Sequence, residues 1–226
     1  MIAVIVPAAG LGKRVGGKTP KQFLTLAGKP LLIWTLEAVQ RVPEVDLIAV
    51  SVLPPYKALL HKWVEEYALK KVRIIVPGGD TRQESVKNAL GALPEETEIV
   101  LVHDAARPLV SVEVIQRVIE VSRRHGAALA ACPARDTIKE IENGKVVRTL
   151  PRERIYLAQT PQGASFPLLK KAFIQAEKDG FVGTDEASLL ENLGVKIFVV
   201  SSPFTNFKVT TAEDLTLAEA LLSQRP

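Results

Sequence analysis

The residues best suited to chemistry lie near the start of the chain, in the segment 7–22. Small residues at 7–12 are followed by a group of cations, namely Lys13, Arg14, Lys18 and Lys21. Small residues let backbone N–H groups approach a ligand closely, and cations favour phosphate. The apolar run 2–6 before this segment is typical of a buried strand, and α/β folds bind nucleotides where such a strand ends. The segment therefore predicts a site for nucleotide phosphates.

Two alternative interpretations of this segment are a dinucleotide-binding loop and a P-loop. The first has glycines at Gly10 and Gly12, but its third glycine comes one residue late and no suitable acidic residue follows about 20 residues on. The second matches residues 12–19 literally as G-x-x-x-x-G-K-T, with 99–104 as the accompanying strand and metal-binding aspartate. Because Pro20 follows directly, the helix that a P-loop requires here is disfavoured.

The segment is the first of seven short motifs that lie between residues 7 and 210 and belong to a pattern covering 2–220. It runs Pro-Ala-Ala-Gly-x-Gly-x-Arg and then Pro-Lys-Gln, and the later motifs are 78–80 with Arg82 and Ser85, 102–108, 135–137, 160–162, 184–186 and 208–210. Together these motifs resemble those of the cytidylyltransferases of isoprenoid-precursor synthesis, and most closely the 2-C-methyl-D-erythritol 4-phosphate cytidylyltransferase family. One such motif alone is weak evidence, whereas seven in register are specific.

The resemblance implies transfer of CMP from CTP to 2-C-methyl-D-erythritol 4-phosphate, with release of pyrophosphate. A phosphate monoester has its second pKa near 6, so the attacking oxygen is mostly ionised at about pH 7 and needs no general base. Catalysis then depends on cations placed where negative charge develops. The alternative within the same fold is a ribitol-5-phosphate, or other pentitol phosphate, cytidylyltransferase. A P-loop NTPase and a nonenzymatic nucleotide sensor are hypotheses from other classes.

The resemblance also assigns roles to individual residues. The catalytic cations are Arg14, Lys21, Arg152 and Lys208. The residues expected to bind the nucleotide are Ala8, Ala9, Gly10, Leu11, Gly12, Gly79, Asp80, Ser85, Ala105 and Arg107. The residues expected to bind the acceptor substrate are Thr137, Arg152, Thr160, Thr184, Asp185 and Lys208. Of these, Thr137 and Arg152 are expected to reach the site of a second subunit.

Asp104 is the residue expected to bind Mg²⁺. It follows the apolar run 99–102, at the carboxyl edge where open α/β sheets bind ligands, and a carboxylate there suits an ion that also bridges phosphates. A helix cap, or a partner for Arg107, is the alternative role for Asp104. Asp80 and Asp185 could likewise cap the helices that follow them. His103 is expected to be a buried or hydrogen-bonded structural residue.

Strand-like and helix-like segments alternate along the chain, which predicts an α/β fold with a mostly parallel sheet covered on both faces. The expected strands are 2–6, 47–53, 72–76, 99–102, 127–131 and 196–200. The expected helices are 31–41, 55–69, 83–93, 112–125, 167–179, 186–193 and 212–223, with Ser111 and Thr211 as N-caps and Gly126 after the fourth. The resemblance implies a Rossmann-like, GT-A-like nucleotidyltransferase domain spanning 1–226.

The stretch 133–155 interrupts this alternation and is expected to be an inserted β-arm. Residues 136–141 alternate at period two, and Asn143-Gly144 precedes a second β-type run. An Asn-Gly pair between two such runs is a strong hairpin signal. The resemblance implies that this arm forms a homodimer and contributes to the partner's active site.

Composition limits the remaining possibilities. The chain has 226 residues, 47% hydrophobic residues, a net charge of +4 and one cysteine, Cys132. Its apolar runs are shorter than the roughly 20 residues that span a membrane, and its start does not resemble a secretory signal. Its cations are interspersed with acidic residues, and only 5% of residues are aromatic, so a nucleic-acid partner is not expected. These features favour a cytoplasmic protein that acts on small molecules.

Overall fold

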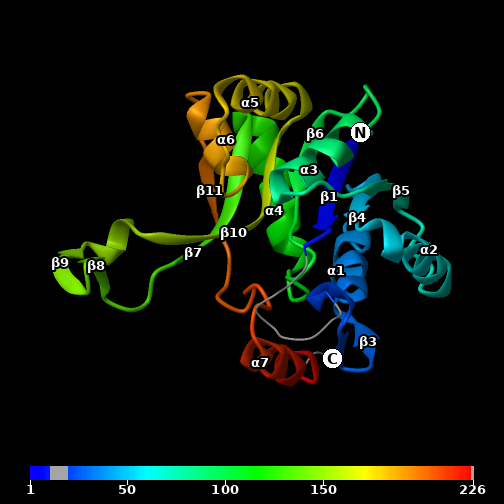
Figure 1. Ribbon diagram of the computed structural model, residues 1–226, viewed down its shortest axis with the longest axis horizontal. Coiled ribbons are helices and arrows are strands. Elements are labelled where there is room, and N and C mark those ends of the chain that lie inside the picture. Colours follow the sequence, from blue (N-terminus) through cyan, green and yellow to red (C-terminus); the bar gives the residue numbers. More distant parts are fainter. Residues whose placement is uncertain (11–19, 225–226) are drawn as a thin grey trace.

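The computed structural model describes residues 1–10 and 20–224 and places a seven-stranded sheet at the centre (Figure 1). The sheet order is β11-β7-β10-β6-β1-β4-β5. The strands are β1 (Ile2–Ala8), β4 (Leu47–Val52), β5 (Val72–Pro77), β6 (Ile99–Val102), β7 (Ala127–Pro133), β10 (Tyr156–Ser165) and β11 (Phe198–Ser201). Every neighbouring pair is parallel except the two that involve β10, which runs antiparallel to both β6 and β7.

Helices cover both faces of this sheet, as the alternation predicts. They are α1 (Leu31–Gln40), α2 (Lys57–Glu66), α3 (Arg82–Gly91), α4 (Val112–His125), α5 (Phe166–Asp179) and α6 (Glu186–Asn192), whereas α7 (Ala212–Leu222) packs in a separate core. Val4 of β1 packs in a core with α1, α2 and α4, whereas its neighbour Ile5 packs in a second core with α3, α5 and α6. Successive strand side chains point to opposite faces, so one apolar strand supplies both cores. In the described ranges no helix has the length and apolarity needed to cross a membrane.

A third, smaller core joins α7 to the start of α1. Leu26 and Leu31 pack there with Val209 and Leu222. Leu26 belongs to β2 (Thr25–Leu26), which pairs with β3 (Lys29–Pro30), and the three-residue turn η1 (Lys21–Phe23) precedes them. This core holds the segment that follows β11 against the segment that follows β1.

The helix boundaries predicted from capping residues are confirmed. Ser111 accepts a hydrogen bond from the backbone of Val114, and Gly126 ends α4 with φ of 91°. Thr211 forms a capping box with Asp214 at the start of α7. The short η2 (Pro54–Tyr56) begins the helical stretch expected from residue 55. These ends follow from local hydrogen bonding, which the sequence reveals directly.

Besides the two-residue strands β2 and β3, the sequence-based expectation missed one strand of the central sheet, β10. Its sequence, Tyr-Leu-Ala-Gln-Thr-Pro-Gln-Gly-Ala-Ser, has neither an apolar run nor a period of two, and its pairing with β7 is irregular between Ala158 and Gln162. The Thr160–Pro161 peptide bond is cis. Residues 159–164 are nevertheless buried between β6 and β7. Neighbouring strands rather than local propensity therefore determine this strand.

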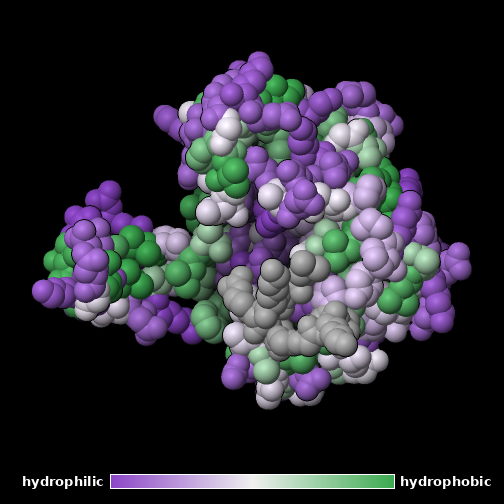
Figure 2. Space-filling view, viewed as in Figure 1, coloured by the Kyte–Doolittle hydropathy of each residue, from purple (hydrophilic) through white to green (hydrophobic). Residues whose placement is uncertain are grey.

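The predicted hairpin is present and projects from the body of the molecule (Figure 1). It consists of β8 (Ile138–Glu142) and β9 (Lys145–Leu150), joined by Asn143 and Gly144 with φ of 49° and 77°. Both turn residues have positive φ, which explains the Asn-Gly pair. Apolar side chains of the hairpin are exposed, as Figure 2 shows, among them Ile141, Val146 and Val147.

Candidate active site

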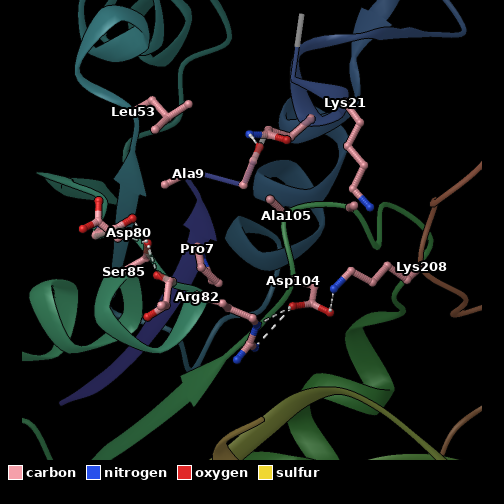
Figure 3. Close-up of a pocket in the computed structure, with 15 residues that line it drawn as sticks. Pro7, Ala9, Lys21, Leu53, Asp80, Arg82, Ser85, Asp104, Ala105 and Lys208 are labelled. Carbon is pink, nitrogen blue, oxygen red and sulfur yellow. Dashed lines mark hydrogen bonds and ion pairs between the residues drawn. The ribbon is translucent and has the colours of Figure 1, made fainter. Parts of the chain in front are cut away.

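A cavity of about 530 Å³ opens where β1, β4, β5 and β6 end (Figure 3). Its lining residues are Pro7, Ala9, Gly10, Lys21, Gln22, Leu53, Gly79, Asp80, Thr81, Arg82, Ser85, Asp104, Ala105, Ala106 and Lys208. The carboxyl edge of a parallel sheet is the usual ligand site in such folds. The cavity thus lies where the sequence predicts the nucleotide.

The first wall is formed by the end of β1 and by η1. The Gln22 amide is buried and donates to the backbone oxygens of Ala8 at 2.6 Å and Gly10 at 2.9 Å. Lys21 Nζ donates to the backbone oxygen of Val209 at 2.7 Å. Gln22 therefore fixes the path of the backbone as it leaves β1, and Lys21 connects this wall to the segment before α7.

Part of the predicted phosphate loop lies outside the described residues. Leu11, Gly12 and Arg14 belong to that part, as do the other residues of the alternative P-loop. From Pro20 onward the chain forms only the three-residue η1 and then β2. No long helix begins in the described stretch directly after Pro20, in agreement with the argument against a P-loop.

The second wall is formed by the end of β5 and the start of α3. Ser85 Oγ accepts a hydrogen bond from the Gly79 N–H at 3.0 Å and donates to the Thr81 oxygen at 2.9 Å. Thr81, not Asp80, caps α3. The alternative role of Asp80 as that cap is therefore wrong, and Asp80 is an exposed residue in the lining of the cavity.

Gly78 brings these two walls together. A Cβ atom at this position would lie 2.1 Å from the Cβ atom of Ala9. The end of β5 can approach the end of β1 this closely only because neither a side chain at 78 nor a large one at 9 intervenes. Gly78 thus lets the two walls pack against each other.

Asp104 lies at the centre of a cluster of cations (Figure 3). It is buried, with Oδ1 3.3 Å from the Arg82 guanidinium, and Oδ2 3.0 Å from Lys208 Nζ and 3.4 Å from Arg107 Nε. Burial by itself would raise the pKa of this carboxyl, but Arg82, Lys208 and Arg107 together hold the pKa well below its usual range. Asp104 is therefore an anion under all ordinary conditions.

The residues behind Asp104 hold it in place. Thr160 Oγ accepts from the Asp104 N–H at 3.0 Å, and its hydroxyl lies 3.0 Å from His103 Nδ1. His103 Nε2 lies 3.2 Å from the Arg107 oxygen, and burial lowers the pKa of His103 to about 4. The ring is therefore neutral near pH 7, donates to Arg107 and accepts from Thr160. His103 is a buried, hydrogen-bonded residue, as expected.

Arg107, which the resemblance assigns to the nucleotide, is not among the residues that line the cavity and instead joins two segments of the site. Its guanidinium is buried and donates to the backbone oxygen of Asn206 at 2.7 Å as well as to the Asp104 carboxylate. The side-chain amide of Asn206 in turn donates to the backbone oxygen of Thr160 at 2.9 Å. Arg107 thus joins the end of β6 to the segment that carries Lys208.

Several residues assigned to the acceptor substrate do not line the cavity of this chain. Thr137 and Arg152 are exposed on the arm, where Arg152 begins η3 (Arg152–Arg154). Thr184 is exposed before α6, and the Thr160 hydroxyl is engaged as described above. Asp185 caps α6, with Oδ1 accepting from the Ser188 N–H at 2.9 Å and Oδ2 from Gln162 at 2.8 Å.

The site also contains side chains to which the sequence assigned no role. These are Gln22, Arg82, Gln162 and Glu186. Each lies inside one of the motifs, which is the only signal that could have found it. Their partners lie up to 104 residues away, as Arg82 and Glu186 do, so spacing along the chain could not pair them.

Comparisons with known proteins agree with this geometry. The family model for 2-C-methyl-D-erythritol 4-phosphate cytidylyltransferase matches residues 2–224. Relatives of that name include one from Acidobacterium capsulatum, 47% identical over 99% of this chain and 98% of its own. Another, from Geotalea uraniireducens, is 45% identical over 98% of this chain and 96% of its own.

Solved structures agree as well. The crystal structure of the cytidylyltransferase of that name from Thermus thermophilus has a TM-score of 0.81 and 37% identity, covering 98% of both chains. A 4-diphosphocytidyl-2C-methyl-D-erythritol synthase from Anaerococcus prevotii has a TM-score of 0.87 and 31% identity, covering 99% of this chain and 98% of its own. The chain therefore belongs to the 2-C-methyl-D-erythritol 4-phosphate cytidylyltransferase family.

Proposed function

We propose that this protein transfers CMP from CTP to 2-C-methyl-D-erythritol 4-phosphate in the non-mevalonate isoprenoid pathway. The products are 4-diphosphocytidyl-2-C-methyl-D-erythritol and pyrophosphate. The observation that carries the proposal is the cavity itself, which is lined both by small residues, among them Ala9, Gly10 and Gly79, and by the cations Lys21, Arg82 and Lys208. Family membership supports the methylerythritol substrate over ribitol 5-phosphate.

The nucleotide is proposed to bind between the wall formed by the end of β1 and the wall formed by the end of β5 with the start of α3. Backbone groups near Ala9 and Gly79 are suited to hydrogen bonding with cytosine, while Asp80 and Ser85 lie where the ribose would follow. Gly78 supports this assignment, because it lets the segments that carry Ala9 and Gly79 lie close together.

The reaction is proposed to depend on positioned cations. The acceptor's phosphate oxygen attacks the α-phosphorus, and pyrophosphate leaves from the opposite side. Two anions must approach each other, so the site must lower their repulsion. Lys21 is held at the β1 side of the cavity and Lys208 at the β6 side. Arg14, which lies outside the described residues, completes the proposed set.

Asp104 is the residue proposed to hold Mg²⁺. Its chemistry fits, because it is ionised and each of its oxygens can accept further bonds beyond the cations now beside it. Mg²⁺ usually takes one or two carboxylates and completes its shell with water and substrate phosphates. The ion would neutralise charge on the phosphates during transfer. Lys208, whose side chain is 34% exposed, is the neighbour able to turn from Asp104 towards a phosphate.

The first test is pyrophosphate release from CTP and Mg²⁺ with 2-C-methyl-D-erythritol 4-phosphate as acceptor. We expect turnover with this pair and none when ribitol 5-phosphate replaces the acceptor or when ATP or GTP replaces CTP. Chelation of the metal should abolish turnover. Turnover with ribitol 5-phosphate alone would contradict the substrate and leave the reaction type intact. Hydrolysis of ATP or GTP without acceptor would contradict the transferase.

The acceptor's remaining contacts are proposed to include a second subunit. Thr137 and Arg152 of one arm would reach the acceptor in the partner's site, and Thr184 and Asp185 are proposed to contact the acceptor from outside the cavity lining. The support is the exposed apolar surface of the hairpin, with Val146 and Val147 60% and 54% exposed. These neighbouring side chains lie on opposite faces of the strand, and exposed apolar surface of this kind usually requires a partner surface.

We expect the full chain to sediment as a dimer at micromolar concentration. Replacing Val146 and Val147 together by serine should shift it towards the monomer, because it removes apolar surface from the arm. Val182, which is 72% exposed and lies before α6, provides the control, since Val182→Ser should leave the dimer intact. A wild-type chain that sediments as a monomer would refute the proposal. A cytoplasmic location stays a prediction from the sequence.

A further inference from the structure

Both arginines beside Asp104 are anchored more closely to other groups. Arg107 donates to the Asn206 oxygen at 2.7 Å but lies 3.4 Å from Asp104. Arg82 lies 2.7 Å and 3.0 Å from the two oxygens of Glu186, but 3.3 Å from Asp104. Hydrogen bonds between ions are normally about 2.7–2.9 Å long. Asp104 is therefore surrounded by cations without being tightly bound to either arginine.

Glu186 occupies an unusual position for a carboxylate. It is 2% exposed and lies in the first turn of α6. A carboxylate buried this deeply is costly unless it is paired and hydrogen-bonded. Its partner in the described part of the chain is Arg82, whose side chain is 30% exposed and reaches the cavity.

The surroundings of Glu186 hold it in place. Asp185 caps the same helix, and Gln162 of β10 donates to Asp185 while accepting from the Ala187 N–H at 2.8 Å. Glu186 is thus bracketed on both sides by residues bonded to the sheet. Because its carboxylate has little freedom to move, it can determine where the Arg82 guanidinium lies.

We propose that Glu186 is a positioning residue for the metal site: it holds Arg82 back from Asp104 and so leaves the Asp104 carboxylate available to a divalent cation. The inference rests on the proposed role of Asp104. Among the described residues, Arg82 contacts two carboxylates, those of Asp104 and Glu186. If Glu186 is replaced by a neutral residue, only the Asp104 carboxylate remains charged. Arg82 would then move onto Asp104 and compete with the metal for the same oxygens.

The test is the affinity of Mn²⁺ for the protein–CTP complex, measured by water proton relaxation without acceptor, so that no turnover occurs. We expect Glu186→Gln to weaken Mn²⁺ binding by about tenfold, since changes in the residues around a metal ligand typically cost about 10–100-fold in metal affinity. The Mg²⁺ concentration for half-maximal rate should rise by a similar factor, while the rate at saturating Mg²⁺ changes less.

The double variant Glu186→Gln/Arg82→Gln separates positioning from a purely structural role. Removing Arg82 also removes the competing cation, so the double variant should recover Mn²⁺ affinity relative to Glu186→Gln alone. Glu191→Gln, an exposed position on the same helix, should behave as the wild type. Glu186→Asp, which keeps the charge but withdraws it from Arg82, should lie between the wild type and Glu186→Gln.

The outcomes distinguish this inference from the proposed function. If Asp104→Asn binds Mn²⁺ as tightly as the wild type, the metal role of Asp104 fails and the inference fails with it. If Asp104→Asn loses binding but Glu186→Gln does not, only the inference is overturned. A double variant no better than Glu186→Gln would also overturn it. Should Glu186→Gln not fold, wild-type affinity in Glu186→Asp would count against it.

Discussion

Replacing Lys21 by alanine is expected to lower kcat by about 10²-fold or more, the range found when one transition-state donor is removed. Lys21 lines the cavity and is held by the Val209 oxygen. Two unit charges about 4 Å apart, at an effective dielectric near 20, interact by roughly 4 kcal/mol. Steady-state pyrophosphate release, with CTP and acceptor varied separately, measures the effect. The loss should fall on kcat more than on either KM.

Lys18→Ala is the matched control, because a P-loop would make that lysine essential and the proposed transferase would not. We expect Lys18→Ala to be mild. Thermal unfolding of the Lys21→Ala variant should remain close to that of the wild type, since Lys21 is only partly buried. A severe effect at Lys18 combined with a mild effect at Lys21 would reverse the interpretation of the whole segment 7–22.

Replacing Asp104 by asparagine is expected to affect both activity and stability. The change leaves Arg82, Arg107 and Lys208 around a neutral group. Removing one partner of a buried ion pair typically costs about 3–5 kcal/mol, and loss of the proposed metal ligand should reduce turnover by about 10²-fold or more. Urea unfolding and pyrophosphate release measure the two effects.

Asp80→Asn is the matched control for charge in the cavity. Asp80 is exposed and does not cap α3, so its replacement should leave the free energy of unfolding nearly unchanged. We expect its effect on KM for CTP instead. An Asp104→Asn variant as stable and active as the wild type would contradict both the electrostatic account and the metal assignment.

The sequence predicted those parts of the fold that depend on local patterns. Apolar runs identified six strands of the central sheet, capping residues such as Ser111 and Thr211 marked helix starts, and the Asn-Gly pair identified the arm. It did not predict β10, because polar and small residues there are buried only by the strands on either side. Pairing across the sheet leaves no local signal for such a strand.

In the site, too, the sequence predicted what depends on local motifs and did not predict contacts between distant segments. Four residues that the motifs assign to one site, Lys21, Gly79, Asp104 and Lys208, line one cavity, and Gly79 and Asp104 do so because strand ends meet at one edge of a parallel sheet. The motifs did not show that Arg82 bridges Asp104 and Glu186. Such a bridge depends on how α3 and α6 lie on the sheet, which becomes known only with the structure.

The sheet and the site end at different points along the chain. All seven strands of the central sheet are complete at Ser201, whereas Lys208 and the Val209 oxygen that holds Lys21 come later. During synthesis from the amino terminus, every strand has therefore been made before the last cation of the cavity exists. Until that segment is added and packs against Leu26 and Leu31, a nascent chain can have its architecture without its full phosphate-binding charge.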